Sequence, residues 1–118
     1  MKRSIEDTPV VFIGAGNLAT NLAKALYYKG FRIVQVYSRT EESASVLAGR
    51  LGCSYVTSLK SVIADADIYV VALKDSALVE LLPQITDGKS EKALFVHTAG
   101  SIPMTIWEGY AGHYGVFY

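Results

Sequence analysis

One junction near the amino terminus constrains the fold of this chain more than any other part of the sequence. Residues 10–13 read Val-Val-Phe-Ile, a continuous apolar run typical of a strand that is buried on both faces. The run stops at Gly14. From Asn17 to Lys29 apolar residues recur at helical spacing, and the following Gly30 tolerates the left-handed backbone that ends many helices. The sequence therefore predicts a buried strand, a tight turn and a helix in direct succession.

The same alternation of strand and helix continues along the chain. Further apolar runs predict strands at residues 31–37, 54–56, 68–73, 93–96 and 113–118. Helical patterns lie between them, at residues 41–51, around 59–63, at 75–82 and near 103–107. Thr40 is expected to cap the first of these helices, and Pro83 to end the third. Such alternation favours right-handed crossovers, so the predicted fold class is α/β: a doubly wound, mainly parallel sheet with helices on both faces.

The length and the charge of the chain disfavour several classes of function. A chain of 118 residues, 51% of them hydrophobic, has the size of one core, so residues 1–118 are predicted to form a single domain. Eleven basic and eleven acidic residues give no net charge, which disfavours nucleic acid and anionic membranes as partners. No apolar run is long enough to cross a membrane, and no secretory signal is recognisable. We therefore expect a cytoplasmic protein, in which the single Cys53 forms neither a disulfide nor a zinc site.

The turn after the first predicted strand carries the clearest functional motif. Residues 14–19 read GAGNLA, the dinucleotide-binding fingerprint with alanine in place of its third glycine. Gly14 permits the tight turn, Gly16 lets the backbone approach a pyrophosphate, and Ala19 keeps the helix close to the sheet. We expect the pyrophosphate to contact this turn, through Gly14, Gly16, Asn17, Leu18 and Ala19. The alternative is a purely structural tight turn.

The end of the second predicted strand indicates which dinucleotide binds. Domains that bind NAD place an acidic residue about 20 residues beyond the glycine turn, where this chain has Ser38, Arg39 and Thr40. No carboxylate repels a 2′-phosphate here, and the guanidinium of Arg39 can stack on adenine or bind the phosphate through two N–H groups. NADP is therefore the expected cofactor. The alternative is an ordinary surface arginine beside the Thr40 helix cap.

Two more loops are expected at the carboxyl edge of the sheet, where open α/β sheets bind ligands. Residues 73–76 follow the fourth strand and residues 97–101 the fifth. We expect these loops to border the cofactor's ribose and nicotinamide, through Leu73, Asp75, His97, Thr98 and Ala99. Asp75 is alternatively only a helix cap. His97 is alternatively a histidine that satisfies backbone groups at a strand end, and no residue is assigned as catalytic.

These segments together resemble a known family. The GAGNLA turn, Ser38-Arg39-Thr40 and the two strand exits at 71–75 and 97–100 are similar to the N-terminal Rossmann domain of NADP-dependent reductases in the 6-phosphogluconate dehydrogenase-like superfamily. Its members include pyrroline-5-carboxylate reductases, deazaflavin-dependent NADP reductases and a little-characterised bacterial group of NADP oxidoreductases. The likeness begins at Val10. His97 is not expected in a pyrroline-5-carboxylate reductase, so the bacterial oxidoreductase group fits better.

The resemblance implies more than the residues themselves show. It implies an oxidoreductase that moves a hydride between the nicotinamide of NADP and a small carbonyl or imine substrate. It also implies a helical C-terminal domain, absent from this sequence, that forms a homodimer and supplies much of the substrate pocket, so this chain alone is expected to bind NADP without turnover. Two alternatives stay open. One is a noncatalytic NADP-binding sensor. The other is a methyltransferase, but those enzymes usually have an acidic residue at the end of the second strand, where this chain has Ser38.

Overall fold

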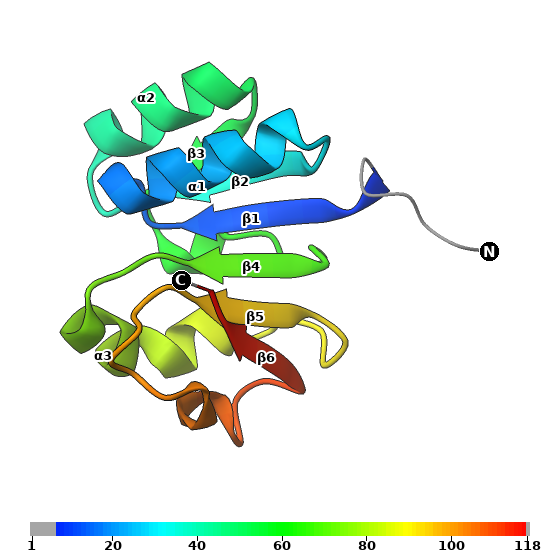
Figure 1. Cartoon of the computed structure of the whole chain (residues 1–118), viewed down its shortest axis with the longest axis vertical. Coiled ribbons are helices and arrows are strands. Elements are labelled where there is room, and N and C mark those ends of the chain that lie inside the picture. Colours follow the sequence, from blue (N-terminus) through cyan, green and yellow to red (C-terminus); the bar gives the residue numbers. More distant parts are fainter. Residues whose placement is uncertain (1–6, 118) are drawn as a thin grey trace.

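Six parallel strands form one sheet in the computed structural model, which describes residues 7–117. The strands are β1 (Pro9–Ile13), β2 (Arg32–Tyr37), β3 (Ser54–Val56), β4 (Ile68–Val71), β5 (Leu94–His97) and β6 (His113–Val116). Their order across the sheet is β3-β2-β1-β4-β5-β6 (Figure 1), and every neighbouring pair is parallel. The chain moves outward in one direction from β1 to β3 and in the other from β4 to β6. The predicted doubly wound sheet is therefore confirmed.

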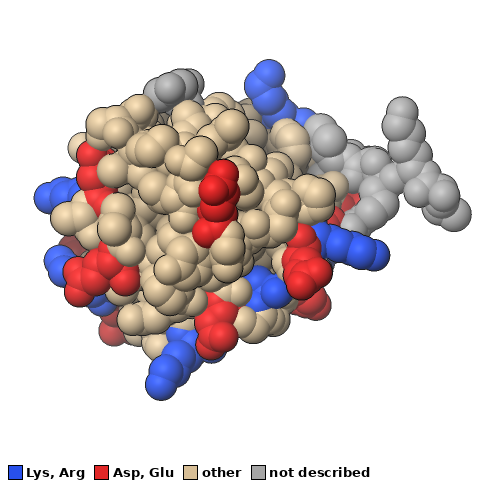
Figure 2. All heavy atoms as spheres, turned by 90° about the horizontal axis from the view of Figure 1, so that it is seen from below, with Lys and Arg blue, Asp and Glu red and all other residues tan. Residues whose placement is uncertain are grey.

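Helices cover both faces of this sheet. Helices α1 (Asn17–Tyr28) and α2 (Glu41–Leu51) pack over the β1–β3 half of one face (Figure 1). Helix α3 (Asp75–Thr86) packs on the opposite face, together with the short 3-10 helices η2 (Leu59–Ser61) and η3 (Met104–Trp107). Within residues 7–117, no helix combines the length and the apolar character that crossing a membrane requires. On the side of the molecule seen in Figure 2, acidic and basic side chains are interspersed.

The central strand β1 is buried on both faces, as its apolar run predicts. Val10 and Phe12 pack with the helices α1 and α2, whereas Val11 and Ile13 pack on the α3 face. All four side chains are completely buried. A strand between two helical layers has no solvent-facing side, so its sequence shows a continuous apolar run instead of alternation.

Helix α3 is longer than the sequence predicts. Pro83 was expected to end the helix at Leu82, but the helix continues to Thr86. Proline has no N–H, so the carbonyl group of Val79 loses its helical partner. Val79 and Pro83 are both exposed, and the completely buried Ile85 continues the apolar stripe beyond the proline. Burial of Ile85 therefore extends the helix through a residue that usually ends one.

Smaller differences concern the ends of strands and one short helix. The fourth strand ends at Val71 rather than at residue 73, and the fifth is displaced by one residue, to Leu94–His97. The segment around residues 59–63 forms only a 3-10 turn. The last predicted strand corresponds to β6, and Tyr118, with which that prediction ended, lies outside the described residues.

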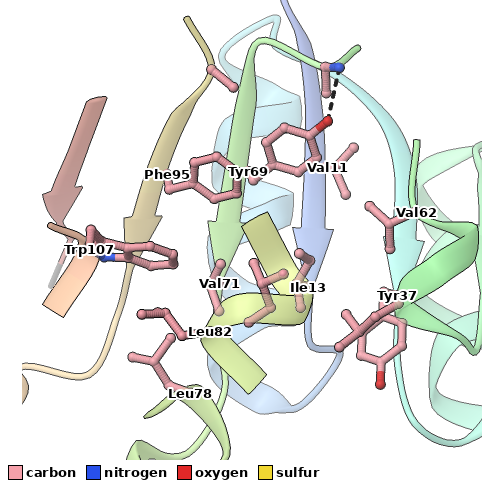
Figure 3. Close-up of a cluster of buried hydrophobic side chains, with 14 residues drawn as sticks. Val11, Ile13, Tyr37, Val62, Tyr69, Val71, Leu78, Leu82, Phe95 and Trp107 are labelled. Carbon is pink, nitrogen blue, oxygen red and sulfur yellow. Dashed lines mark hydrogen bonds between the residues drawn. The ribbon is translucent and has the colours of Figure 1, made fainter. Parts of the chain in front are cut away.

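Aromatic rings pack β4 and β5 against η3 on the α3 face of the sheet (Figure 3). The rings of Tyr69 and Phe95 stack with centroids 4.9 Å apart, and Phe95 contacts Trp107 at 5.4 Å. The Tyr69 hydroxyl donates a hydrogen bond to the carbonyl oxygen of Ile63 at 2.6 Å and accepts one from the N–H of Ala66 at 3.2 Å. These ring contacts and hydrogen bonds connect β4 and β5 to η3 and to the loop after η2.

Candidate functional site

The turn after β1 is held by both neighbouring strands. The N–H of Gly14 donates to the carbonyl oxygen of Tyr37 at 2.8 Å, and the N–H of Ala72 donates to that of Ile13 at 2.8 Å. Gly14 has a φ of 118°, and a Cβ atom at this position would collide with the carbonyl oxygen of Ala72. Glycine is therefore required here both by conformation and by space. The ends of β1, β2 and β4 meet at this point.

Gly16 lies in an open environment. Its φ is −77°, which any residue adopts, and a Cβ atom here would meet no described atom within 4 Å. Gly16 is the N-cap of α1, and no side chain caps the helix there. The first N–H groups of a helix have no partner within it and carry partial positive charge. The space over Gly16 is therefore suited to an anionic group.

A cleft of about 540 Å³ opens beside this turn. Three segments form its walls: the turn after β1, the end of β2, and the exit of β4 with the first turns of α3. Its position is the switch point between β1 and β4, where the strand order reverses and where open α/β sheets bind ligands. The volume lies in the range of small-molecule sites. Among the predicted site residues, those that line the cleft are Gly14, Gly16, Ser38, Arg39 and Leu73.

The segment that follows β2 presents a cation and two hydroxyl groups. Arg39 and Thr40 are exposed. Within residues 7–117 the structure records neither a hydrogen bond nor an ion pair for the Arg39 guanidinium. Thr40 occupies the predicted N-cap position of α2, but its side chain makes no capping hydrogen bond, and its N–H donates to Oγ of Ser38 at 3.4 Å. The donors of Arg39 and the hydroxyl of Thr40 are thus free for a ligand.

The side chains in the first turn of α1 are partly exposed and partly buried in the core. Asn17 and Leu18 are exposed at the start of the helix. Ala19 is 1% exposed and packs against the sheet, where the fingerprint requires a small residue. Asn17 lines a separate cavity of about 290 Å³, which is also lined by residues of α2. A ligand over Gly16 would therefore meet the backbone of this turn rather than the side chains of Asn17 and Ala19.

Asp75 connects the start of α3 to the loop after β5 instead of capping the helix. Lys74 is the N-cap of α3 and Asp75 its first residue. The carboxylate of Asp75 accepts a hydrogen bond from the hydroxyl of Ser101 in the loop after β5. In that loop Thr98 and Ala99 are half-buried, and Ala99 packs against the core on the α3 face. The side chains of Asp75, Thr98 and Ala99 do not line the cleft, so the structure does not place them at its walls.

His97 belongs to the core. The side chain is completely buried at the end of β5. The indole N–H of Trp107 donates to its Nδ1 at 3.0 Å, and its Nε2 lies 2.8 Å from the carbonyl oxygen of Ile102. Because an indole N–H only donates, Nδ1 is the acceptor and Nε2–H donates to Ile102. Both ring nitrogens are used within the protein, which corrects the expectation that this side chain contacts cofactor or substrate.

Four polar or charged residues of the cleft were not singled out by the sequence: Tyr37, Lys74, Ser76 and Glu80. Ser76 and Glu80 are four residues apart and so share one face of α3. That helical spacing, directly after a strand exit, is a signal from which both could have been found. Tyr37 instead ends an apolar run and carries no polar pattern of its own. Lys74 adds a second cation to the cleft, beside Arg39.

The segments that build this cleft all lie in a stretch that matches one protein family. The model of that family matches residues 9–100. The chain belongs to the family described as NADP oxidoreductase, coenzyme F420-dependent. This membership confirms the predicted Rossmann domain of an NADP oxidoreductase, with NADP as the cofactor, and favours it over the methyltransferase alternative.

Several relatives of this NADP oxidoreductase domain are known. A protein from Bacteroides fragilis, assigned as an NADP oxidoreductase, is 69% identical with a TM-score of 0.94, over 98% of this chain and 45% of that one. The pyrroline-5-carboxylate reductase of Pseudomonas aeruginosa is 29% identical over 105 residues, which are 87% of this chain and 38% of that enzyme. The glutamyl-tRNA reductase of Caldivirga maquilingensis is 38% identical over 65 residues, 53% of this chain and 16% of that enzyme. This chain therefore spans less than half the length of these relatives.

Proposed function

We propose that this chain forms the NADP(H) site of an oxidoreductase that transfers a hydride between the nicotinamide and a small carbonyl or imine substrate. The observation that carries the proposal is the open space over Gly16, at the uncapped start of α1 and in the wall of the cleft. A pyrophosphate there accepts hydrogen bonds from backbone N–H groups and lies at the positive end of the helix. The bound cofactor supplies the hydride chemistry, and this chain binds and orients it.

Arg39 supports NADP as the form of the cofactor that binds. Arg39 lines the cleft just after the end of β2 and is exposed, and its guanidinium has no recorded partner within residues 7–117. A planar guanidinium binds phosphate oxygens through two parallel N–H donors. In this proposal the 2′-phosphate is bound by Arg39, with the hydroxyls of Ser38 and Thr40 beside it and Lys74 as a second cation in the cleft.

The nicotinamide end of the cofactor is proposed to extend past Leu73, which lines the cleft at the exit of β4. Backbone groups of Thr98 and Ala99 at the neighbouring exit of β5 would border it. His97 takes no part through its side chain, because its ring nitrogens are both bonded in the core. We assign the substrate pocket and a homodimer contact to segments beyond this chain, since its relatives are more than twice as long. A reducing cytoplasm is the location that the unpaired Cys53 thiol supports.

The test is a calorimetric titration of the chain with NADPH and with NADH at one salt concentration. We expect NADPH to bind at least about tenfold more tightly, which corresponds to about 1.4 kcal/mol. Arg39→Asp is expected to abolish this preference, because a carboxylate repels the 2′-phosphate. The matched control is Arg32→Asp, which changes an exposed arginine at the opposite end of β2. Equal binding of both cofactors to the unchanged chain, or a preference that survives in Arg39→Asp, would contradict the assignment.

A further inference from the structure

The side chain of Tyr37 combines nearly complete burial with an unbonded hydroxyl. It is 7% exposed and packs in the core on the α3 face. Within residues 7–117 the structure records no hydrogen bond for this hydroxyl, and no buried side-chain polar atom there lacks a partner, so the hydroxyl itself retains contact with solvent. Tyr37 lines the cleft, and in Figure 3 its hydroxyl is directed away from the other labelled side chains. A polar group in this position is ready to bond a ligand.

Helix α3 provides the facing wall of the same cleft. The residues that it contributes, Ser76, Ala77, Glu80 and Leu81, are spaced as two pairs four residues apart and so lie along one face. Ser76 and Ala77 are small and leave room over the first turn. Glu80 is exposed, and among the described residues it forms no recorded ion pair, although Arg39 and Lys74 line the same cleft.

The groups that line the cleft correspond to the parts of a dinucleotide. The glycine turn lies at the switch point, Ser38 and Arg39 follow at the end of β2, and the α3 face lies opposite that end. With the pyrophosphate over Gly16 and the 2′-phosphate at Arg39, the purine base is left in the space between Tyr37 and Glu80. This placement rests on the proposed function.

We propose that Tyr37 and Glu80 recognise the purine base of the cofactor and select a base that carries an exocyclic amine. An ionised carboxylate only accepts hydrogen bonds, so Glu80 requires an N–H donor, whereas the O–H of Tyr37 donates to a ring nitrogen. On the edge formed by N6 and N7, adenine presents an amine next to an unprotonated ring nitrogen and so satisfies both groups. On the same edge hypoxanthine presents two acceptors, O6 and N7, so its carbonyl oxygen would face the Glu80 carboxylate without a donor between them.

The test compares NADPH with its deaminated analogue, in which hypoxanthine replaces adenine. Calorimetric titration of the chain is expected to show at least about tenfold tighter binding of NADPH, the size of one charge-assisted hydrogen bond. In Glu80→Gln this preference is expected to fall below about threefold, because the amide both donates and accepts. Tyr37→Phe retains the buried ring and is expected to weaken NADPH binding. Glu108→Gln changes an exposed glutamate outside the cleft and is the matched control.

The possible outcomes distinguish a failure of the base-recognition proposal from a failure of the proposed cofactor site. Equal affinity of the unchanged chain for the two cofactors, or an unchanged preference in Glu80→Gln, overturns the base recognition and leaves the NADP site standing. Failure of the chain to bind either cofactor overturns the proposed function, and the base recognition with it. Circular dichroism of each variant checks folding, and Glu80→Gln, an exposed substitution, decides the question if Tyr37→Phe fails to fold.

Discussion

The indole N–H of Trp107 donates a hydrogen bond to Nδ1 of His97 at 3.0 Å, and both side chains are completely buried. The bond connects η3 to the end of β5. It orients the imidazole so that Nε2–H reaches the carbonyl oxygen of Ile102. A histidine at the ligand-binding edge of the sheet is thereby a structural residue that holds the loop after β5 against the strand.

Trp107→Phe is expected to lower the free energy of unfolding by about 1–3 kcal/mol, because Nδ1 of His97 then lacks a donor in the interior. Urea unfolding followed by circular dichroism measures the change. A double-mutant cycle with His97→Leu should give a coupling of at least about 0.5 kcal/mol. NADPH affinity should stay within about twofold of the unchanged chain. A large loss of affinity in a variant of normal stability would instead place His97 in the site.

Alanine substitutions at the two turn glycines should have opposite consequences. Gly14→Ala forces a side chain into a φ of 118° and against the carbonyl oxygen of Ala72, so we expect a loss of at least about 1–3 kcal/mol in the free energy of unfolding. Gly16→Ala meets open space, so stability should change by less than about 1 kcal/mol. Its Cβ atom would obstruct the pyrophosphate, and NADPH affinity should fall at least about tenfold. Normal NADPH binding by Gly16→Ala would contradict the assigned position of the pyrophosphate.

The hydroxyl of Tyr69 should stabilise the fold most below pH 10. Burial raises the pKa of the Tyr69 hydroxyl above its ordinary value of about 10. Above pH 10 the unfolded chain therefore releases the proton while the folded chain still holds it. Its contribution is therefore complete below the ordinary pKa and is lost as the pH rises through the raised value. Tyr69→Phe should cost about 1–3 kcal/mol at pH 7, and this difference should shrink above pH 10. Urea unfolding of both chains at pH 7, 10 and 11 measures it, and a constant difference would contradict the linkage.

Pro83→Ala should raise the free energy of unfolding by at least about 1 kcal/mol, because alanine restores the N–H that bonds the Val79 carbonyl within α3. Thermal and urea unfolding measure the gain. Pro103→Ala is the control, since Pro103 lies at an N-cap and interrupts no helix. A loss of stability in Pro83→Ala would show that the proline contributes packing that its exposure does not indicate.

Local patterns were sufficient for the order of the elements and for the glycine turn. The apolar run before Gly14 and the helical spacing after it involve residues adjacent in sequence, and the turn that they predict is the one observed. Helix α3 continues past Pro83 because the buried Ile85 extends its apolar stripe. The expected cofactor contacts of the Asp75 and His97 side chains differ from the structure for another reason, which the two share. Asp75 bonds Ser101, and His97 bonds Trp107, in segments that no local pattern connects to them.

Some residues of the cleft could likewise be predicted from local sequence patterns, and others could not. Arg39 and Gly16 could be chosen from the sequence because the fingerprint and its spacing to the second strand are local to one strand-helix-strand unit. Tyr37 and Glu80 could not be paired in advance. They face one cleft because β4 lies beside β1, which brings the start of α3 opposite the end of β2.

The sequence by itself determined the order of the strands and helices, the two-sided burial of β1 and the glycine-dependent turn, since each depends on side-chain periodicity or backbone freedom within a short segment. The tertiary structure alone decided which polar groups face the cleft and which are bonded in the core. The periodicity of apolar residues indicates which side of a helix or strand is buried. The order of the strands in the sheet determines which residues pack against that side. A histidine at the end of β5 and a tyrosine at the end of β2 therefore have opposite environments: His97 has Trp107 and Ile102 as partners, and the Tyr37 hydroxyl opens to the cleft.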